Sequence, residues 1–325
     1  MFPFRSDLER RMAAWAIARQ GVDEFPLRLK RRRLYILPTR AGLGFAAVVF
    51  GILLAALNYG NGTALGLAGL LAGLALVAMH ECHRNLLDLE ISTIETTPAF
   101  AGGRGLVALA LRNDARIARL RVQVEAKGAV RPVIVDLAPN AGARAVLEVP
   151  AARRGQLRIE RVRISTTHPF GLFRAWTWLA VPLAVIVVFP RPHGSRPFPP
   201  PEGALKDSGR SAGRGELDEW HGLRAFRDGD SPRQVAWKAY ARGAPLLVKE
   251  YVSSGSGERV FDFGRLPGLD GEARLEQHAR WIVDADACGE RYGLVLPGSV
   301  FAPDRGAEHR RCALTALALH GLEAS

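Results

Sequence analysis

The sequence predicts a membrane-anchored, multi-domain protein: a two-helix transmembrane hairpin, then a β-sandwich-like domain, then a small α/β region. Three observations lead to this fold class. Residues 41–79 contain no charged side chain, residues 86–190 consist of short aliphatic and β-branched runs, and residues after 258 alternate between strand-like and helix-like segments. A chain of 325 residues is long enough for about two domains.

The chain begins with a basic segment, residues 1–40, which we expect to be cytosolic. It holds ten Lys or Arg and four Asp or Glu, an excess of six out of the net charge of +12. A basic flank beside an apolar segment favours contact with an anionic cytosolic leaflet. The remaining charge is too dispersed to predict a nucleic-acid-binding stripe, so we expect no nucleic-acid partner. Ser6 and Glu9 have capping-box spacing, which fits either an amphipathic helix on the membrane or an ordinary surface helix.

Residues 41–79 predict the hairpin because they are too long for one span of about 20 residues and divide at a turn-forming cluster, Asn58–Asn61. Gly62 and Gly66 have small-xxx-small spacing, which lets two helices approach closely. A hairpin in a soluble core would carry a polar face, and this segment has none. We therefore expect the lipid bilayer to surround it.

The flanks of the hairpin predict its orientation. Five basic residues precede it: Lys30, Arg31, Arg32, Arg33 and Arg40. Arg84 follows it, whereas the tip is uncharged, so the positive-inside rule places both ends in the cytosol. His80, Cys82 and His83 offer a possible metal site, but no distant partner cluster is evident. We favour a polar interfacial end to the second helix and expect no metal there.

Residues 86–190 predict a β-sandwich-like domain because short strands alternate with turn clusters. The clearest period of two is at residues 119–126, and we expect Arg and Lys side chains at alternate positions of the strands in residues 86–190 to face solvent. The apolar stretch 175–190 is about 15 residues long and contains Pro182, so we predict two strands around a turn and no third span. Residues 191–215, rich in Pro, Gly and Arg, predict a linker; a plain spacer is favoured over a docking peptide.

Residues 216–325 combine a charged motif with the α/β region. In 216–251, Ser231 has the position of a helix cap and Pro232 that of a first helical residue, which predicts a helix ending near Gly243. The dense charges there indicate either a partner surface or an ordinary solvated face, and charge alone favours the solvated face. The candidate partner-binding residues are Arg224, Asp230, Arg233, Trp237, Arg242 and Lys249.

The remaining residues predict a strand at 259–264, a helix at 270–291, a strand at 292–298 and a helix at 304–322. Such an order is typical of α/β structure, with the two strands parallel and joined by a right-handed crossover.

Three segments resemble the membrane proteins called domain of unknown function 58, which accompany MoxR-type AAA+ ATPases. They are LPTRAG at residues 37–42, the run that ends in THPFGLFRAW at 153–176, and GLRAFRDGDSPRQVAWKAYARGAPLLVKEY at 222–251. The resemblance implies a bacterial inner (cytoplasmic) membrane protein. With the orientation predicted from the charged flanks, we expect its soluble domains and both termini to be cytosolic. It implies a MoxR-type ATPase as partner, a transglutaminase-like membrane protein as a possible second one, and a role in assembly, maturation or remodelling of protein complexes.

The resemblance also implies that the C-terminal part is a degenerate, truncated von Willebrand factor A-like region. That fold can hold a cation at a DxSxS loop, and here only Asp262 matches. One carboxylate without its hydroxyl partners is a poor site for a hard divalent cation, so we expect no metal.

The sequence contains no Walker A motif, no GxSxG and no HExxH, and its cysteines, Cys82, Cys288 and Cys312, form no CxxC pair. We therefore expect no cofactor and no enzymatic activity, and the favoured hypothesis is a non-enzymatic membrane adaptor for the ATPase. Two alternatives remain open. One is a membrane scaffold for a transglutaminase-like protein without an ATPase, and the other is a hydrolase that uses Asp218 and His221.

Overall fold

The computed structural model describes residues 23–181, 184–200, 219–225, 237–243, 245, 247–252 and 258–322. The chain forms two compact units, which we describe separately. Unit 1 comprises the residues up to Arg191 together with the last five, and unit 2 comprises Pro192–His320. The predicted amphipathic helix near Ser6 lies outside the described residues.

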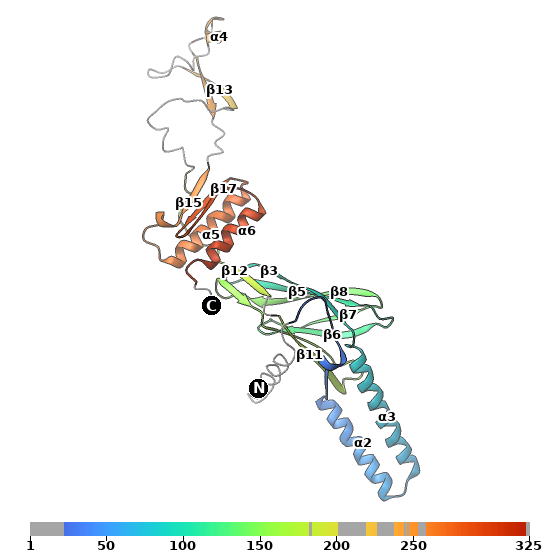
Figure 1. The fold of residues 1–325 in the computed structure, drawn as a ribbon. Coiled ribbons are helices and arrows are strands. Elements are labelled where there is room, and N and C mark those ends of the chain that lie inside the picture. The colour runs from blue at the N-terminus through green and yellow to red at the C-terminus, as the bar shows by residue number, and fades with distance from the viewer. Residues whose placement is uncertain are drawn as a thin grey trace. The chain divides into compact units, whose positions relative to one another are not determined.

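Unit 1 contains two long apolar helices, α2 (Arg40–Asn58) and α3 (Gly62–Arg84), which pack against each other as a hairpin (Figure 1). Thr39 caps the first helix and Asn61 the second, because each side-chain oxygen accepts a backbone N–H three residues on. The mean hydropathy of the two is 2.1 and 2.0, and only 11% of each apolar window is buried. The predicted two-helix hairpin is confirmed, and both helices are long and apolar enough to cross a membrane.

The rest of unit 1 is sheet-rich and built from three sheets. The first, in spatial order, is β1 (Leu27–Arg28), β3 (Glu90–Thr97), β5 (Arg104–Asn113) and β8 (Ala141–Pro150). The second is β2 (Tyr35–Pro38), β11 (Phe173–Ala180), β10 (Arg161–Thr166), β6 (Arg119–Ala126) and β7 (Val133–Leu137). The third is β4 (Ala99–Phe100), β12 (Val185–Phe189) and β9 (Gly155–Arg158). The predicted strand-rich region is confirmed, including the two strands β11 and β12 in the apolar stretch 175–190.

One hydrophobic core joins the inner faces of these sheets. Val107 and Leu109 of β5 are fully buried, as are Val122 and Val124 of β6, and all four belong to a single buried cluster. Alternation of buried and exposed positions along the strands produces this arrangement, since successive side chains of a strand point to opposite faces.

The segment before the hairpin, which the sequence predicts only as a basic segment, contains two short strands. Leu27 of β1 pairs with Ile91, and Tyr35 of β2 pairs with Trp176. Between these strands lies a short 3₁₀ helix, η1 (Arg31–Arg33), and Leu29 is completely buried. Apolar residues between the basic ones belong to strands that add to two sheets. The chain therefore enters the sheet-rich region before it forms the hairpin.

Unit 2 contains β15 (Arg259–Asp262), a 3₁₀ turn η3 (Phe263–Arg265), α5 (Gly271–Ala287), β16 (Tyr292–Leu296), β17 (Ser299–Asp304) and α6 (Ala307–Leu319). The predicted order of strand, helix, strand and helix is confirmed, and β15 and β16 are parallel. One strand was missed: β17 runs antiparallel to β16, and its residues alternate between half-buried and exposed. A six-residue strand containing Pro303 lacks the apolar run that identifies its neighbours.

Residues 192–200, which the sequence places in a linker, contact the α/β region of unit 2. Gln277 of α5 accepts a hydrogen bond from the backbone N–H of Arg196 at 2.9 Å and donates one to its carbonyl oxygen at 3.3 Å. The Arg259 guanidinium lies 4.5 Å from the ring centre of Phe198. Extended backbone can pack in this way without a periodic sequence, because hydrogen bonds from unit 2, such as those of the Gln277 side chain, hold its backbone groups.

Candidate functional site at the base of the helical hairpin

Two of the segments that resemble a known family meet where α2 begins. The backbone N–H of Thr39 donates to the carbonyl oxygen of Leu172 at 2.8 Å, and its hydroxyl donates to that of Gly171 at 2.5 Å. The same hydroxyl accepts from the N–H of Gly42 at 3.1 Å. Thr39 therefore caps the helix and fastens it to the loop formed by Thr167–Leu172.

Gly42 makes this attachment possible because it allows a very close approach of two backbones. A Cβ at this position would lie 2.0 Å from the carbonyl oxygen of Leu172. Every residue other than glycine would force the helix and the loop apart. The close contact with Leu172 therefore explains why a glycine stands at the last position of the LPTRAG segment.

The last part of α3 is fastened to the same sheet. Cys82 is 1% exposed, and its thiol lies 3.5 Å from the carbonyl oxygen of Phe173 and 3.7 Å from that of Thr166. The buried thiol faces strand backbone and not the neighbouring histidines. In the part of the chain that the structure describes, no three His, Cys, Asp or Glu side chains gather closely enough to hold a metal ion.

A buried polar network holds the end of α3 in place. The side chain of Asn85 donates to the carbonyl oxygen of Leu120 at 2.8 Å and to the hydroxyl of Thr166 at 2.9 Å, and it accepts from the N–H of Leu120 at 3.0 Å. The side-chain amide of Asn85 is thereby fully used. Its hydrogen bonds fix the residue that follows α3 to β6 and β10.

Arg119 completes the network and corrects the expectation that basic residues of this strand face solvent. It is 2% exposed, donates to the side chain of Asn113 at 2.7 Å and to the carbonyl oxygen of Asn85 at 3.0 Å. Burial lowers the pKa of its guanidinium, and the charge of Asp88 opposes that shift. A positive group at a helix C-terminus interacts favourably with the helix dipole. Alternation alone gives no sign that Arg119 is buried.

The predicted partner-binding residues lie in unit 2, and the structure describes them in part. Trp237 belongs to α4 (Trp237–Tyr240), is 55% exposed, and its ring packs edge-on against that of Tyr240 at 6.3 Å. Arg242 is exposed in the turn that follows the helix, which ends at Tyr240, three residues before the predicted end near Gly243. The predicted helix start at Ser231 and Pro232 lies outside the described residues. Asp230 and Arg233 lie outside the described residues.

The other two candidates stand on a two-stranded antiparallel ribbon, β13 (Glu219–Ala225) and β14 (Leu247–Val252). Arg224 is paired with Val248, and Lys249 with Leu223. His221 falls where the register shifts between Trp220 and Gly222. The ribbon brings Arg224 and Lys249 to neighbouring register positions although 25 positions separate them in sequence.

Asp262 ends β15, and its carboxylate is engaged by the chain itself. Oδ1 accepts a hydrogen bond from the N–H of Gly264 at 2.8 Å, and Oδ2 lies 3.3 Å from Nε of Arg265. The carboxylate therefore caps η3. This is a structural role for the one residue that matches the cation-binding loop.

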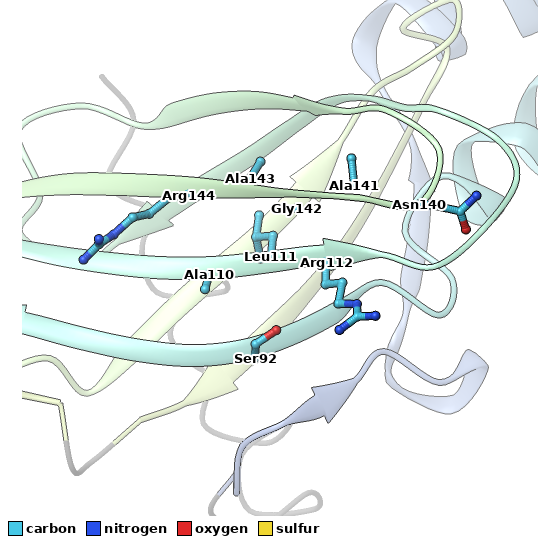
Figure 2. A pocket seen from close by; sticks show the side chains of 9 residues that line it. All are labelled: Ser92, Ala110, Leu111, Arg112, Asn140, Ala141, Gly142, Ala143 and Arg144. Atoms are coloured by element: carbon cyan, nitrogen blue, oxygen red, sulfur yellow. The ribbon is translucent and has the colours of Figure 1, made fainter.

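An open pocket of about 570 Å³ lies on the outer face of the first sheet (Figure 2). Small residues of β5 and β8 form its floor, and Arg112 and Arg144 stand beside it. Arg112 donates to Asp114 at 2.7 Å and Arg144 to Glu95 at 2.6 Å. Because carboxylates pair with both guanidinium groups, the pocket offers no surplus charge for an anionic ligand, and we assign none.

Comparison with known proteins adds no relative to this geometry. No protein-family model matches the chain, and no curated protein matches it in sequence. The resemblance of the three segments to domain of unknown function 58 therefore remains a prediction from their residues.

Proposed function

We propose that this chain is a non-enzymatic adaptor of the bacterial inner membrane that works with a MoxR-type AAA+ ATPase in the maturation or remodelling of protein complexes. The observation that carries the proposal is the hairpin. Two helices of 19 and 23 residues with a mean hydropathy of 2.1 and 2.0 are only 11% buried over their apolar windows. A core helix of a soluble protein would be mostly buried, whereas these exposed apolar helices have the length and composition that suit a lipid bilayer, which supports the proposal.

The proposed orientation puts both ends of the hairpin in the cytosol. Exposed basic residues, Arg31, Arg32 and Arg40, precede the spans, and the tip around Asn58–Asn61 is uncharged. Both units then face the compartment in which a AAA+ ATPase obtains ATP. Tethering to the membrane raises the effective concentration of the adaptor near a client in the same bilayer.

The choice of partner rests on the resemblance of the three segments. Two of them meet in the hydrogen bonds between Thr39 and the loop at Gly171 and Leu172, which support a fixed joint between span and sheet. The third holds Arg224, Asp230, Arg233, Trp237, Arg242 and Lys249, which we propose as the partner-binding surface. The parallel pair β15 and β16, joined by α5, supports a von Willebrand factor A-like origin for the C-terminal region.

The experiment is site-specific photocrosslinking in native membranes. A photoreactive residue replaces Trp237, which is one of the six candidate residues and is 55% exposed, and a matched control replaces Val300, which is 75% exposed on β17. We expect an adduct with a MoxR-type ATPase from position 237 and none from position 300. Equal adducts from both positions, or none that contains an ATPase, would overturn the choice of partner.

Topology is tested separately with a tag at the C-terminus of the full chain. In intact spheroplasts, added protease should leave the tag uncut, and it should remove the tag after the membrane is permeabilised. Digestion in intact spheroplasts would contradict the cytosolic orientation and the adaptor with it.

A further inference from the structure

The loop Thr167–Leu172 carries an exposed aromatic side chain beside the start of α2. Phe170 is 59% exposed, although large apolar side chains are usually buried. The next residue, Gly171, accepts the hydrogen bond from the Thr39 hydroxyl at 2.5 Å. Phe170 is thus held one residue from a contact with the N-terminal cap of α2, and the loop cannot move independently of the helix.

The surroundings of Phe170 are apolar and basic. Leu37 of β2 is 54% exposed and pairs with Arg174 of β11, and Leu43 in the first turns of α2 is 58% exposed. Arg40 and Arg174 are both exposed. Residues 167–174 and 34–43 contain no Asp or Glu. This combination of large apolar and cationic side chains fits the boundary between lipid headgroups and acyl chains.

The length of α2 sets the depth of this surface. Its 19 residues rise about 28 Å at about 1.5 Å per residue, close to the ~30 Å of a bilayer hydrocarbon core. Arg40, its first residue, then lies at the cytosolic edge of that core. The loop at Gly171 and Leu172 is hydrogen-bonded to the cap of the same helix, so Phe170 lies at the same level.

We infer that the loop Thr167–Leu172 is a lipid-interface contact, with Phe170 inserted among the headgroups of the cytosolic leaflet and Arg40 and Arg174 beside lipid phosphates. This inference rests on the proposed membrane anchoring and adds a third point of contact to the two helices. A contact at the loop in addition to the two helices restrains the tilt of the sheet-rich unit against the bilayer more than the hairpin alone does.

The test uses the full chain, with Cys288 and Cys312 changed to Ser and the buried Cys82 retained. Single cysteines replace Phe170, Leu54 in the middle of α2, or Val130, and each carries a nitroxide spin label. Val130 is 50% exposed and serves as the control position. The backbone N–H of Lys127, three residues before it, donates to the carbonyl oxygen of Arg161. Arg161 pairs with Ala180, which lies at the end of β11 opposite to Phe173. The protein is placed in vesicles of phosphatidylethanolamine and phosphatidylglycerol.

The depth of each nitroxide in the bilayer is measured from its collision rates with two reagents. One is oxygen, which dissolves in lipid, and the other is a nickel chelate, which stays in water. We expect position 54 to be reached by oxygen only, position 130 by the chelate, and position 170 to be several-fold less accessible to the chelate than position 130. If position 54 lies in lipid but 170 is as accessible as 130, the loop contact is wrong and the anchoring stands. If position 54 is also open to the chelate, the anchoring and the inference both fail.

Discussion

The guanidinium group of Arg119 donates a hydrogen bond to the backbone carbonyl oxygen of Asn85, 3.0 Å away, where α3 ends. A cation from a sheet strand thus satisfies a carbonyl group that the helix itself leaves unpaired. At the same base of the hairpin, where α2 begins, Thr39 joins this helix to the loop at Gly171 and Leu172. Both helices therefore enter the sheet-rich region through specific hydrogen bonds, and the predictions below begin with these two joints.

Replacing Arg119 with Ala should destabilise unit 1 by about 2–4 kcal/mol, because the buried oxygens of Asn113 and Asn85 would lose a charged donor. The expected result is a clear fall in the melting temperature of the detergent-solubilised chain. The matched control is Arg116→Ala, an exposed residue in the turn before β6, which should change stability by less than about 0.5 kcal/mol. Equal melting temperatures for the two variants would show that the network does not hold the joint.

Gly42→Ala should loosen the attachment of α2, because the new Cβ would lie 2.0 Å from the carbonyl oxygen of Leu172. Gly44→Ala is a matched control in the same helix, since nothing lies within 4 Å of a Cβ at position 44. We expect a lower melting temperature for the first variant and an unchanged or higher one for the second. The prediction is wrong if alanine is tolerated equally at both positions.

Stability of unit 2 should fall as the pH drops below 6.5. His278 is completely buried between the rings of Phe263 and Trp281, and burial lowers the pKa of its imidazole from the ordinary value of 6.5. Below pH 6.5 the imidazole of His278 binds a proton in the unfolded chain but stays neutral in the folded one. The free energy of unfolding is therefore highest above pH 6.5 and falls on acidification by at most about 1.4 kcal/mol per pH unit.

The charged groups that face His278 are Asp262 and Arg274, and they do not reverse the direction of the pKa shift. Denaturant titrations at several pH values measure the effect, with His278→Phe as the variant that removes it. His193→Gln, at an exposed position, should retain it. A dependence that survives in His278→Phe would assign it to another group.

Gln277→Ala should release residues 192–200 from α5, since the side-chain amide of Gln277 binds both backbone groups of Arg196. Hydrogen exchange of the full chain should become faster at the amide of Arg196, and to a smaller extent at that of His193, which donates to the carbonyl oxygen of Glu276 at 3.3 Å. Arg280→Ala, on the exposed side of the same helix, should leave both rates unchanged. Unchanged exchange in Gln277→Ala would mean that the other contacts hold the segment, among them the hydrogen bond from Nε1 of Trp281 to the carbonyl oxygen of Arg196 at 3.3 Å and the 4.5 Å contact of Arg259 with Phe198.

Arg233→Ala is predicted to reduce capture of the proposed ATPase in a pull-down from detergent extracts, with little change in melting temperature. The reason is the charge that it contributes to the candidate surface with Arg224 and Lys249. Arg305→Ala, an exposed arginine of unit 2, is the control and should capture as much as the unaltered chain. A large fall in melting temperature for Arg233→Ala would instead assign the residue a structural role.

Elements with strong local periodicity could be predicted from the sequence. β6 follows the predicted boundaries, residues 119–126, because Val122, Val124 and Ala126 alternate with exposed or half-buried positions. The hairpin was predicted because charge-free runs of this length are rare outside membranes. In both cases the local order of apolar and polar residues directly reflects which side chains are buried and which are exposed, so no contact distant in sequence is needed for the prediction.

Other features depend on contacts distant in sequence and were missed. β1 and β2 are only two and four residues long, and they are strands because Ile91 and Trp176 lie beside them. Arg119 occupies a position in β6 that looks solvent-facing, and only Asn85 and Asn113 show that it is buried. Of the candidate residues, the sequence predicted the helix that includes Trp237, but it predicted neither the strand β13 nor the joint at Thr39, whose partners lie more than 130 positions away.

Because β2 precedes the hairpin and β3 follows it, the two apolar helices are an insertion between strands of two sheets. Deleting everything before Asn85 would leave β11 and β3 with open edges and remove the buried Leu29. A water-soluble form should be obtained by excising residues 41–79 and reconnecting the cut ends with a short flexible bridge. Such a shortened protein would keep the native strand neighbours and suit crystallisation without detergent.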